Sequence, residues 1–206
     1  MSDNTSAKLA QRLNQILPKL TSDDFLSAQG IGNEIAFYIF DYPPEFELQV
    51  REHVDSLLDH LPRHKPGLRF KHINLFTFLI DFLIERQLLE KSFKLQSDKG
   101  NDALLKALKG VLHEEKVAKR FAEVAKPSEH DLVMISGVGS AYPLLRSHTL
   151  LSNLHTHMGQ TPLVMFYPGQ YDTQTLRLFG KTGLTGGTAE ERRTKTNYYR
   201  AFRLID

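Results

Sequence analysis

The segment from Ser136 to Pro143, Ser-Gly-Val-Gly-Ser-Ala-Tyr-Pro, has the composition and position of a ligand-binding turn. It follows an apolar run and precedes a helical pattern, and open α/β sheets bind ligands in such loops. Gly137 and Gly139 would let backbone amides approach a phosphate, but a dinucleotide fingerprint requires a third glycine where Tyr142 stands. The alternative is a tight turn in which both glycines adopt unusual backbone angles. We therefore expect no bound cofactor, with these glycines as the only candidates for one.

Arg146 and His148 lie at the start of the helical pattern that follows this turn. A helix N-terminus together with an arginine can bind an anion, although Arg146 could equally hold a carboxylate of the protein itself. His155 and His157 are two residues apart, which directs their rings to different sides of a helix. No acidic residue accompanies them at the spacing of a metal site, so we expect no metal.

The sequence shows no arrangement typical of nucleophilic catalysis. The G-x-S-x-G pattern of a nucleophile elbow is absent, because Ser136 precedes its glycine and Ser140 has no glycine after it. Adjacent carboxylates, such as Asp23 and Asp24, lie in polar segments and are better explained as capping or solvated groups. We therefore predict that the protein is not an enzyme.

The C-terminal end is basic and aromatic. Between Arg177 and Arg203 there are seven lysines and arginines and only two glutamates, with several tyrosines and phenylalanines among and before them. Such a segment can stack nucleic-acid bases or anchor a protein interface, whereas a solvated loop with core aromatics is the simpler alternative. The predicted contact residues for a protein partner, or for DNA or RNA, are Arg146, His148, Arg177, Arg192, Arg193, Lys195, Tyr198 and Arg200.

The composition indicates one folded domain of ordinary globular character. The chain has 206 residues, of which 41% are hydrophobic and 24% are charged, and its net charge is +2. It has no cysteine, which excludes disulfides and suits a reducing compartment, so we expect a cytoplasmic protein. The longest apolar stretch, Phe76 to Ile84, is interrupted by Thr77 and Asp81, and no membrane span is predicted.

Apolar periodicity places the elements that must position these residues. Short apolar runs predict strands over 34–41, 69–75, 131–136, 163–167 and 197–205, and helical periodicity predicts helices over 6–20, 44–61, 76–89, 102–126 (with a reset near 110–114) and 143–158. A polar break is expected over 97–101. Strands this apolar, separated by helices, favour an α/β three-layer sandwich with a mainly parallel sheet of about five strands flanked by helices.

An N-terminal helical segment, 1–28, is expected to extend a single α/β domain over 29–206. The apolar stripe of this segment, which includes Leu9, Leu13 and Leu20, would either cover the sheet or pair with a second copy, so a homodimer is one alternative. Four glycines among polar residues predict a mobile loop near 180–196.

Several segments together resemble one protein family, BrxB of the BREX (bacteriophage exclusion) phage-defence systems. They begin with Gly-Ile-Gly-Asn-Glu-Ile-Ala-Phe-Tyr-Ile from Gly30 and Ile-Asn-Leu-Phe from Ile73. They continue with the turn at 135–148, the Phe-Tyr-Pro-Gly turn from Phe166 and the closing Tyr-Tyr-Arg-Ala-Phe from Tyr198. The resemblance runs in the same order from about Leu26 to the end of the chain.

The resemblance implies a component of a system that methylates host DNA and blocks replication of unmodified phage. In such systems a methyltransferase, the alkaline-phosphatase-like protein PglZ and a large ATPase carry the recognised chemistry, and BrxB-like subunits have no established catalytic residues. It therefore implies an adaptor that binds PglZ and other BREX proteins. Two alternatives remain at this point: a nucleic-acid-binding subunit using the basic C-terminal patch, and a degenerate nucleotide-binding domain using the Gly137 turn.

Overall fold

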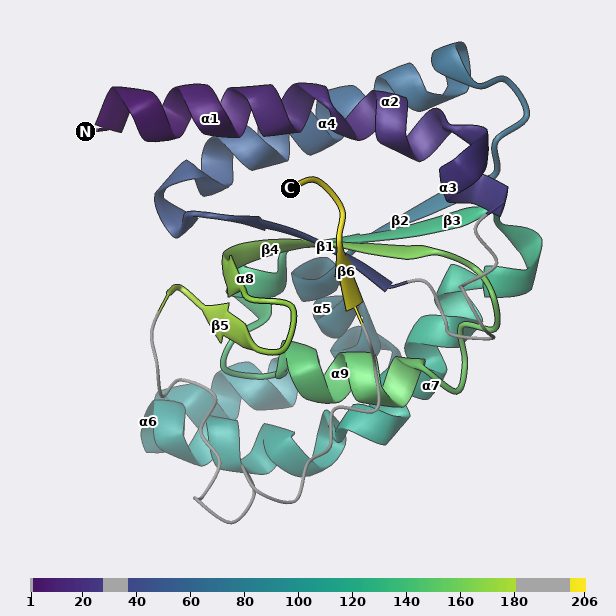
Figure 1. The fold of residues 1–206 in the computed structure, drawn as a ribbon. Helices are drawn as coiled ribbons and strands as arrows, with labels where there is room; N and C mark the ends of the chain where they lie inside the picture. The colour runs from purple at the N-terminus through teal and green to yellow at the C-terminus, as the bar shows by residue number, and fades with distance from the viewer. Residues whose placement is uncertain (1, 28–36, 181–200) are drawn as a thin grey trace.

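Short, apolar strands form a six-stranded sheet at the centre of the molecule (Figure 1). The structure is a computed structural model and describes residues 2–27, 37–180 and 201–206. Five strands are parallel in the order β2-β3-β4-β1-β6, and β5 pairs antiparallel with β4. The strands are β1 Phe37–Tyr42, β2 Phe70–Asn74, β3 Leu132–Ser136, β4 Leu163–Tyr171, β5 Leu176–Leu178 and β6 Ala201–Arg203.

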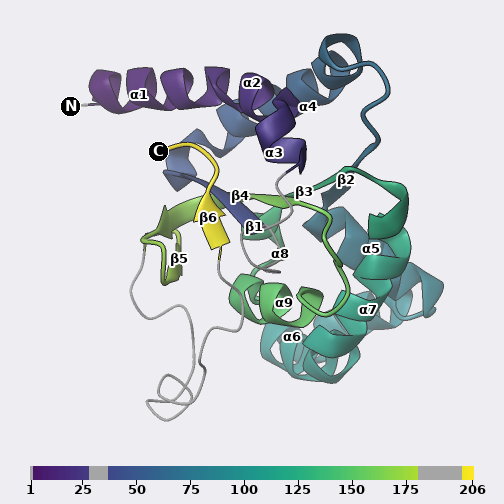
Figure 2. The same ribbon diagram turned by 45° about the vertical axis from the view of Figure 1, so that its right-hand side comes forward.

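Helices cover both faces of this sheet, as Figures 1 and 2 show from two directions. One face carries α1 Ser2–Asn14, α2 Ile16–Thr21, α3 Asp23–Ser27 and α4 Glu47–His64, with the short 3-10 helix η1 Pro44–Phe46 before α4. The other face carries α5 Leu75–Glu85, α6 Leu89–Val111, α7 Glu114–Ala125, α8 Val138–Ala141 and α9 Ser147–Leu154, with η2 Pro127–Glu129 after α7. The predicted α/β sandwich with a mainly parallel sheet is therefore confirmed.

Alternation along the strands divides the core into two halves. In β3, Leu132 and Met134 face the α1–α4 side, whereas Val133 and Ile135 face the α5–α9 side, and all four are fully buried. Successive side chains of a strand point to opposite faces, so a strand covered on both faces must be apolar throughout. This is why the apolar runs at 131–136 and 163–167 predicted strands correctly.

The N-terminal apolar stripe covers α4 and the sheet within the same chain. Leu9, Leu13, Ile16 and Leu20 are buried in the core half that also contains Val54 and neighbouring residues of α4. Of the two alternatives that the sequence left open for this stripe, packing within the chain is the one observed.

The predicted boundaries were right in part. The polar break expected over 97–101 is confirmed as a kink in α6 at Gly100, where φ is 79° and ψ is 179° and two helical stretches meet. The polar side chains there lie on the exposed surface of the helix. The helix expected over 143–158 is shorter, since a turn precedes α9 and its regular part begins at Ser147. The strand β5 was not predicted. Parts of the first and last predicted strands (34–36 and 197–200) and nearly all of the predicted mobile loop (181–196) lie outside the described residues.

Within the described ranges, no helix is both long enough and apolar enough to cross a membrane.

A largely buried ion pair joins α1 and the C-terminal residues to strand β1. Arg12 on α1 donates to the Asp41 carboxylate (2.8 Å) and carbonyl (2.7 Å), and also to the carbonyl of Ile205 (3.2 Å). The second carboxylate oxygen of Asp41 accepts from the amide of Tyr171 on β4 (3.0 Å). Arg12 also lies over the ring of Phe40, 4.8 Å from its centroid. One arginine therefore fixes the N-terminal helices, the end of β1 and the C-terminus together.

We predict that Arg12→Met destabilises the fold strongly, because the variant leaves the Asp41 carboxylate buried without its cation. Removing one partner of a fully buried pair costs roughly 3–5 kcal/mol, and since the Arg12 side chain retains 21% exposure we expect about 2–4 kcal/mol here. Urea unfolding measures the change. Lys19→Met, at an exposed lysine on α2, is the control, and an equal effect of the two substitutions would contradict the prediction.

Candidate functional site

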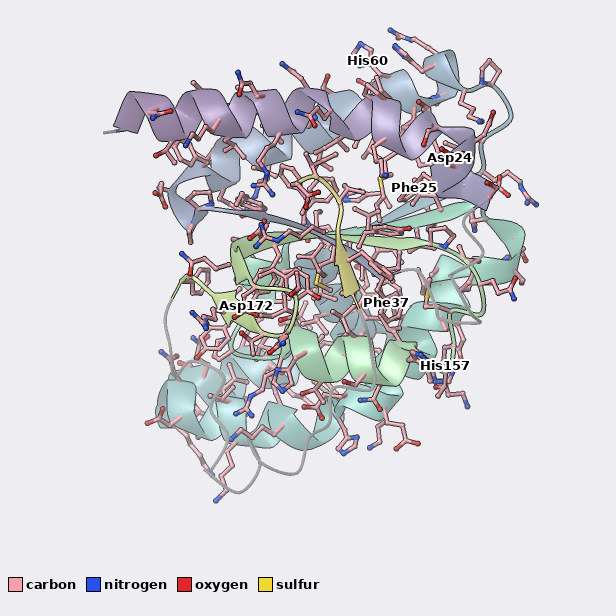
Figure 3. All side chains as sticks on the ribbon, viewed as in Figure 1. Asp24, Phe25, Phe37, His60, His157 and Asp172 are labelled. Carbon is pink, nitrogen blue, oxygen red and sulfur yellow. The ribbon has the colours of Figure 1, made fainter. Side chains whose placement is uncertain are left out.

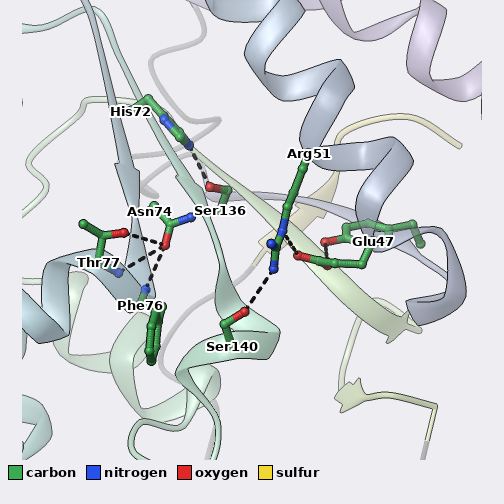
Figure 4. A network of polar contacts seen from close by, with 9 residues as sticks. Glu47, Arg51, His72, Asn74, Phe76, Thr77, Ser136 and Ser140 are labelled. Carbon is green, nitrogen blue, oxygen red and sulfur yellow. Dashed lines mark hydrogen bonds and ion pairs between the residues drawn. The ribbon is translucent and has the colours of Figure 1, made fainter.

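Polar side chains gather at the carboxyl ends of β2 and β3, where open α/β sheets bind their ligands. Asn74 ends β2 and Ser136 ends β3, and the two residues are direct partners in the parallel ladder. The side chain of Asn74 caps α5 by accepting from the amides of Phe76 (3.1 Å) and Thr77 (3.2 Å). Figure 4 shows this network from close by. The ends of β2 and β3 and the N-terminal cap of α5 therefore lie next to one another.

The glycine turn is closely packed on both sides. Gly137 adopts a left-handed conformation (φ 70°), and a Cβ placed on it would lie 2.8 Å from Cγ of Asn74. A Cβ on Gly139 would lie 3.0 Å from Pro168 and 3.2 Å from Phe179. The absence of a side chain at these two positions therefore lets β2, the β3–α8 turn and the end of β4 approach one another. The Asn74 side chain fills the space that opens beside Gly137.

His72 and Ser136 form a histidine–hydroxyl pair at this edge. Nε2 of His72 lies 2.8 Å from Oγ of Ser136, and the Ser136 residue is only 8% exposed. Burial lowers the pKa of His72 below its ordinary 6.5, against a smaller opposing effect of Asp55. A catalytic serine would need a third group that orients the histidine, and no described residue hydrogen-bonds to the other ring nitrogen of His72. The pair thus contains the serine and histidine of a catalytic triad without the third group, and its hydrogen bond connects β2 to β3.

A second polar chain connects α4 across the sheet edge to α8. Glu47 accepts from the hydroxyl of Tyr42 (2.6 Å) and from Nε of Arg51 (3.0 Å), and Arg51 donates onward to Oγ of Ser140 (3.1 Å) (Figure 4). Burial, followed by the hydrogen bond to Glu47, raises the pKa of Tyr42 well above its ordinary value, so the phenol remains a donor. The chain fixes the β3–α8 turn relative to the helix on the opposite face.

Arg146 and His148 lie where the start of α9 meets β5. Arg146 immediately precedes α9, and His148 lies in its first turn with Nε2 3.1 Å from Oγ1 of Thr149. Both line a small cavity that also contacts Leu176 and Leu178 of β5 and encloses about 20 Å³. One water requires roughly 10–15 Å³ of this kind of space. The structure therefore brings the predicted contact residues of α9 close to β5, around a space that holds about one water.

Among the contact residues predicted in the basic C-terminal segment, Arg177 is described by the structure, and its side chain is paired within the β4–β5 turn. It donates to Asp172 on the loop between β4 and β5 (3.1 Å). Hydrogen bonds from Thr175, followed by one from the Gln174 amide and then by the Arg177 charge, hold the pKa of Asp172 below its ordinary value. The other predicted contacts of this segment lie outside the described residues, namely Arg192, Arg193, Lys195, Tyr198 and Arg200.

No group of three or more metal-ligating side chains occurs in the parts of the chain that the structure describes. His155 contacts the ring of Phe37 edge-on, and His157 lies exposed near the end of α9 (Figure 3). The groups that sequence reasoning did not find are Arg12 with Asp41, and His72 with Ser136. For one contact of the polar network the sequence does carry a signal: Glu47 and Arg51 are four residues apart on a helix, a spacing that favours an ion pair.

Comparison with known proteins identifies the family of this chain. A family model described as "BREX protein BrxB" matches residues 71–204. A protein of that name from Bacillus cereus (strain H3081.97) is 38% identical over 203 residues, which cover 97% of this chain and 98% of the relative. Another of the same name from Escherichia coli O9:H4 (strain HS) is 43% identical over 198 residues, covering 96% and 92% respectively. No solved structure matched.

The lowered pKa of His72 predicts a pH-dependent stability. The unfolded chain binds the proton near pH 6.5, whereas the folded chain binds it only at lower pH, so the free energy of unfolding decreases as pH falls through this window. We expect His72→Gln to flatten this decrease, measured by urea unfolding at a series of pH values downward from 6.5. The exposed His157→Gln is the control, and equal pH slopes in His72→Gln and the unsubstituted protein would refute the interpretation.

The packing of the glycine turn predicts unequal costs for two alanine substitutions. Gly159→Ala, with φ at 58° and nothing near a new Cβ, should cost only backbone strain, about 1–2 kcal/mol. Gly137→Ala has similar strain and must also displace the Asn74 cap, so about 3 kcal/mol or more is expected. Chemical denaturation compares the two, and equal losses of stability would show that the contact with Asn74 is unimportant.

Proposed function

We infer a function from one premise: the chain belongs to the BrxB family of BREX proteins. The resemblance noticed in the sequence is thereby confirmed, and the protein is a subunit of a BREX phage-defence system. We propose that it is a non-catalytic, cytoplasmic adaptor that binds PglZ and helps to assemble the complex for host DNA methylation and phage defence.

The sheet edge supports a role without catalysis. At the position where a related architecture would hold a ligand, the side chain of Asn74 lies against Gly137, and no carboxylate of the described residues hydrogen-bonds to the ring of His72. The adjoining cavity beside Arg146 has space for about one water, whereas small-molecule sites typically span roughly 300–1,000 Å³. The polar groups at this edge are thus engaged with one another, although His72, Asn74 and Thr77 also line a larger cavity of about 380 Å³ beside α5 and α7.

The surface formed by α9 and β5 supports a role in binding a protein. Arg146, just before α9, and His148 on α9 lie beside β5, whose Arg177 is half-buried and forms an ion pair with Asp172 of the preceding loop. Arginines on a rigid framework are frequent anchors of protein interfaces, because a planar guanidinium binds carboxylates and aromatic rings well. We call this the α9–β5 surface, and we propose it as the site that binds PglZ. It is the single observation that most favours an adaptor.

Purified protein and purified PglZ from the same BREX system should co-elute from a size-exclusion column at micromolar concentration. Arg146→Glu combined with Arg177→Glu should raise the dissociation constant at least tenfold, which corresponds to about 1.4 kcal/mol. The reason is that the reversed charges lie within the proposed surface and outside the core.

Arg63→Glu is the matched control, since Arg63 is an exposed arginine on α4, on the opposite face of the sheet. Separate peaks for the unsubstituted proteins would overturn the proposed partner. Equal weakening by the control and by the double variant would instead overturn the proposed surface.

A further inference from the structure

The strand β2 is an edge of the sheet and pairs with β3 alone among the described strands. In Figure 2 it lies at the right-hand end of the sheet, beyond β3, with α5 and α7 below it. An edge strand presents unpaired backbone donors and acceptors, which makes it a template for a further strand. The α9–β5 surface involves β4 and β5, on the other side of β3 from this edge.

Backbone alternation identifies the groups that face outward. The carbonyl of Arg69 accepts from the amide of Asp131 (2.7 Å), so the backbone groups of Arg69 point toward the β3 side. The N–H and C=O groups of successive residues in a strand point to opposite edges. Phe70 and His72 therefore direct their backbone groups to the open edge, at the spacing that an added strand requires.

A groove runs beside this edge, between β2 and the helices below it. It encloses about 380 Å³ and has apolar side chains from three elements along it, including Ile73 of β2, Phe78 and Phe82 of α5, and Val124 of α7. This volume lies in the range of binding pockets and far exceeds the space beside Arg146. Alternate side chains of a strand added to β2 would point into this groove, because they would share the face of Ile73.

The charges of the groove favour a particular kind of strand. Arg120 is neutralised by two carboxylates, those of Glu85 (2.5 Å) and Glu123 (3.1 Å). Asp81 on α5 also lines the groove, is exposed and has no ion-pair partner among the described residues. Lys71 on β2 is half-buried and likewise forms no ion pair with a described residue. A bound strand with a basic residue near Asp81 and an acidic residue near Lys71 would pair both charges.

We propose that this groove binds an extended segment of another protein, which pairs with β2 as an additional strand. The segment directs apolar side chains onto Phe78 and Phe82 and a lysine or arginine toward Asp81. Main-chain hydrogen bonds then supply affinity, and the groove supplies specificity, as in other cases of strand addition. The protein would thereby hold two partners at separate places on one rigid sheet, which goes beyond binding at the α9–β5 surface.

The test uses peptides selected on the full-length protein from a displayed library of random 12-residue sequences. We expect selected peptides to lack proline, to alternate apolar residues and to contain lysine or arginine. Binding should slow amide hydrogen exchange at 70–74. Asp81→Lys should weaken binding at least tenfold by fluorescence polarisation, because it repels the basic residue of the peptide. Asp59→Lys, at an exposed aspartate on α4, is the matched control and should leave binding unchanged.

Three outcomes would overturn the proposal. The first is selection of peptides whose affinity is the same for Asp81→Lys and the unsubstituted protein. The second is protection that appears elsewhere while exchange at 70–74 is unchanged. The third is a dimer in light scattering that Asp81→Lys dissociates, since the groove would then bind a second copy of this chain. None of these readouts involves PglZ, so failure here is distinguishable from failure of the proposed function.

Discussion

The ion pair between Arg12 and Asp41 is the interaction on which the arrangement of the described elements most depends. Asp41 lies near the end of β1, which is hydrogen-bonded on both sides, to β4 and to β6. Its carboxylate binds α1 through Arg12 and β4 through the amide of Tyr171, and Arg12 also binds the carbonyl of Ile205. A buried charge is costly without its partner, so these segments are stable in this arrangement only together. The β4–β5 hairpin, and with it half of the α9–β5 surface, is positioned by that constraint.

Hydrogen bonds also hold together the carboxyl edge of the sheet. Parallel strands end together, and each end must satisfy the first amides of the helix that follows it. Asn74 does this for α5, Ser136 hydrogen-bonds to His72, and the Glu47–Arg51 pair reaches across from α4 to Ser140. These hydrogen bonds hold the strand ends and the following helices in one arrangement, from which both proposed surfaces project. The two proposed surfaces differ accordingly: one presents arginines, and the other presents an apolar groove with an unpaired aspartate.

The fold was largely predictable from the sequence because its signals are local. Continuous apolar runs identified β3 and β4, and these runs with the intervening helices indicated a parallel sheet. The polar residues at 97–101 likewise indicated the kink in α6 at Gly100, whereas β5 was not predicted because it has only three residues. The polar site was less predictable, since His72 and Ser136 are separated by 64 residues and Arg12 and Asp41 by 29. The periodicity of apolar residues along the sequence gives no information about contacts between residues so far apart. The glycines of the 137–139 turn were found, but sequence could not show that Asn74 lies against them.

We propose that this protein is an adaptor that binds PglZ through the α9–β5 surface. Amide hydrogen exchange of the protein, alone and with excess purified PglZ, is the direct test. We expect slower exchange in the complex over 146–154 and 176–178, with exchange in α1 and α4 unchanged. Exchange that is identical with and without PglZ, or protection confined to α1 and α4, would contradict it.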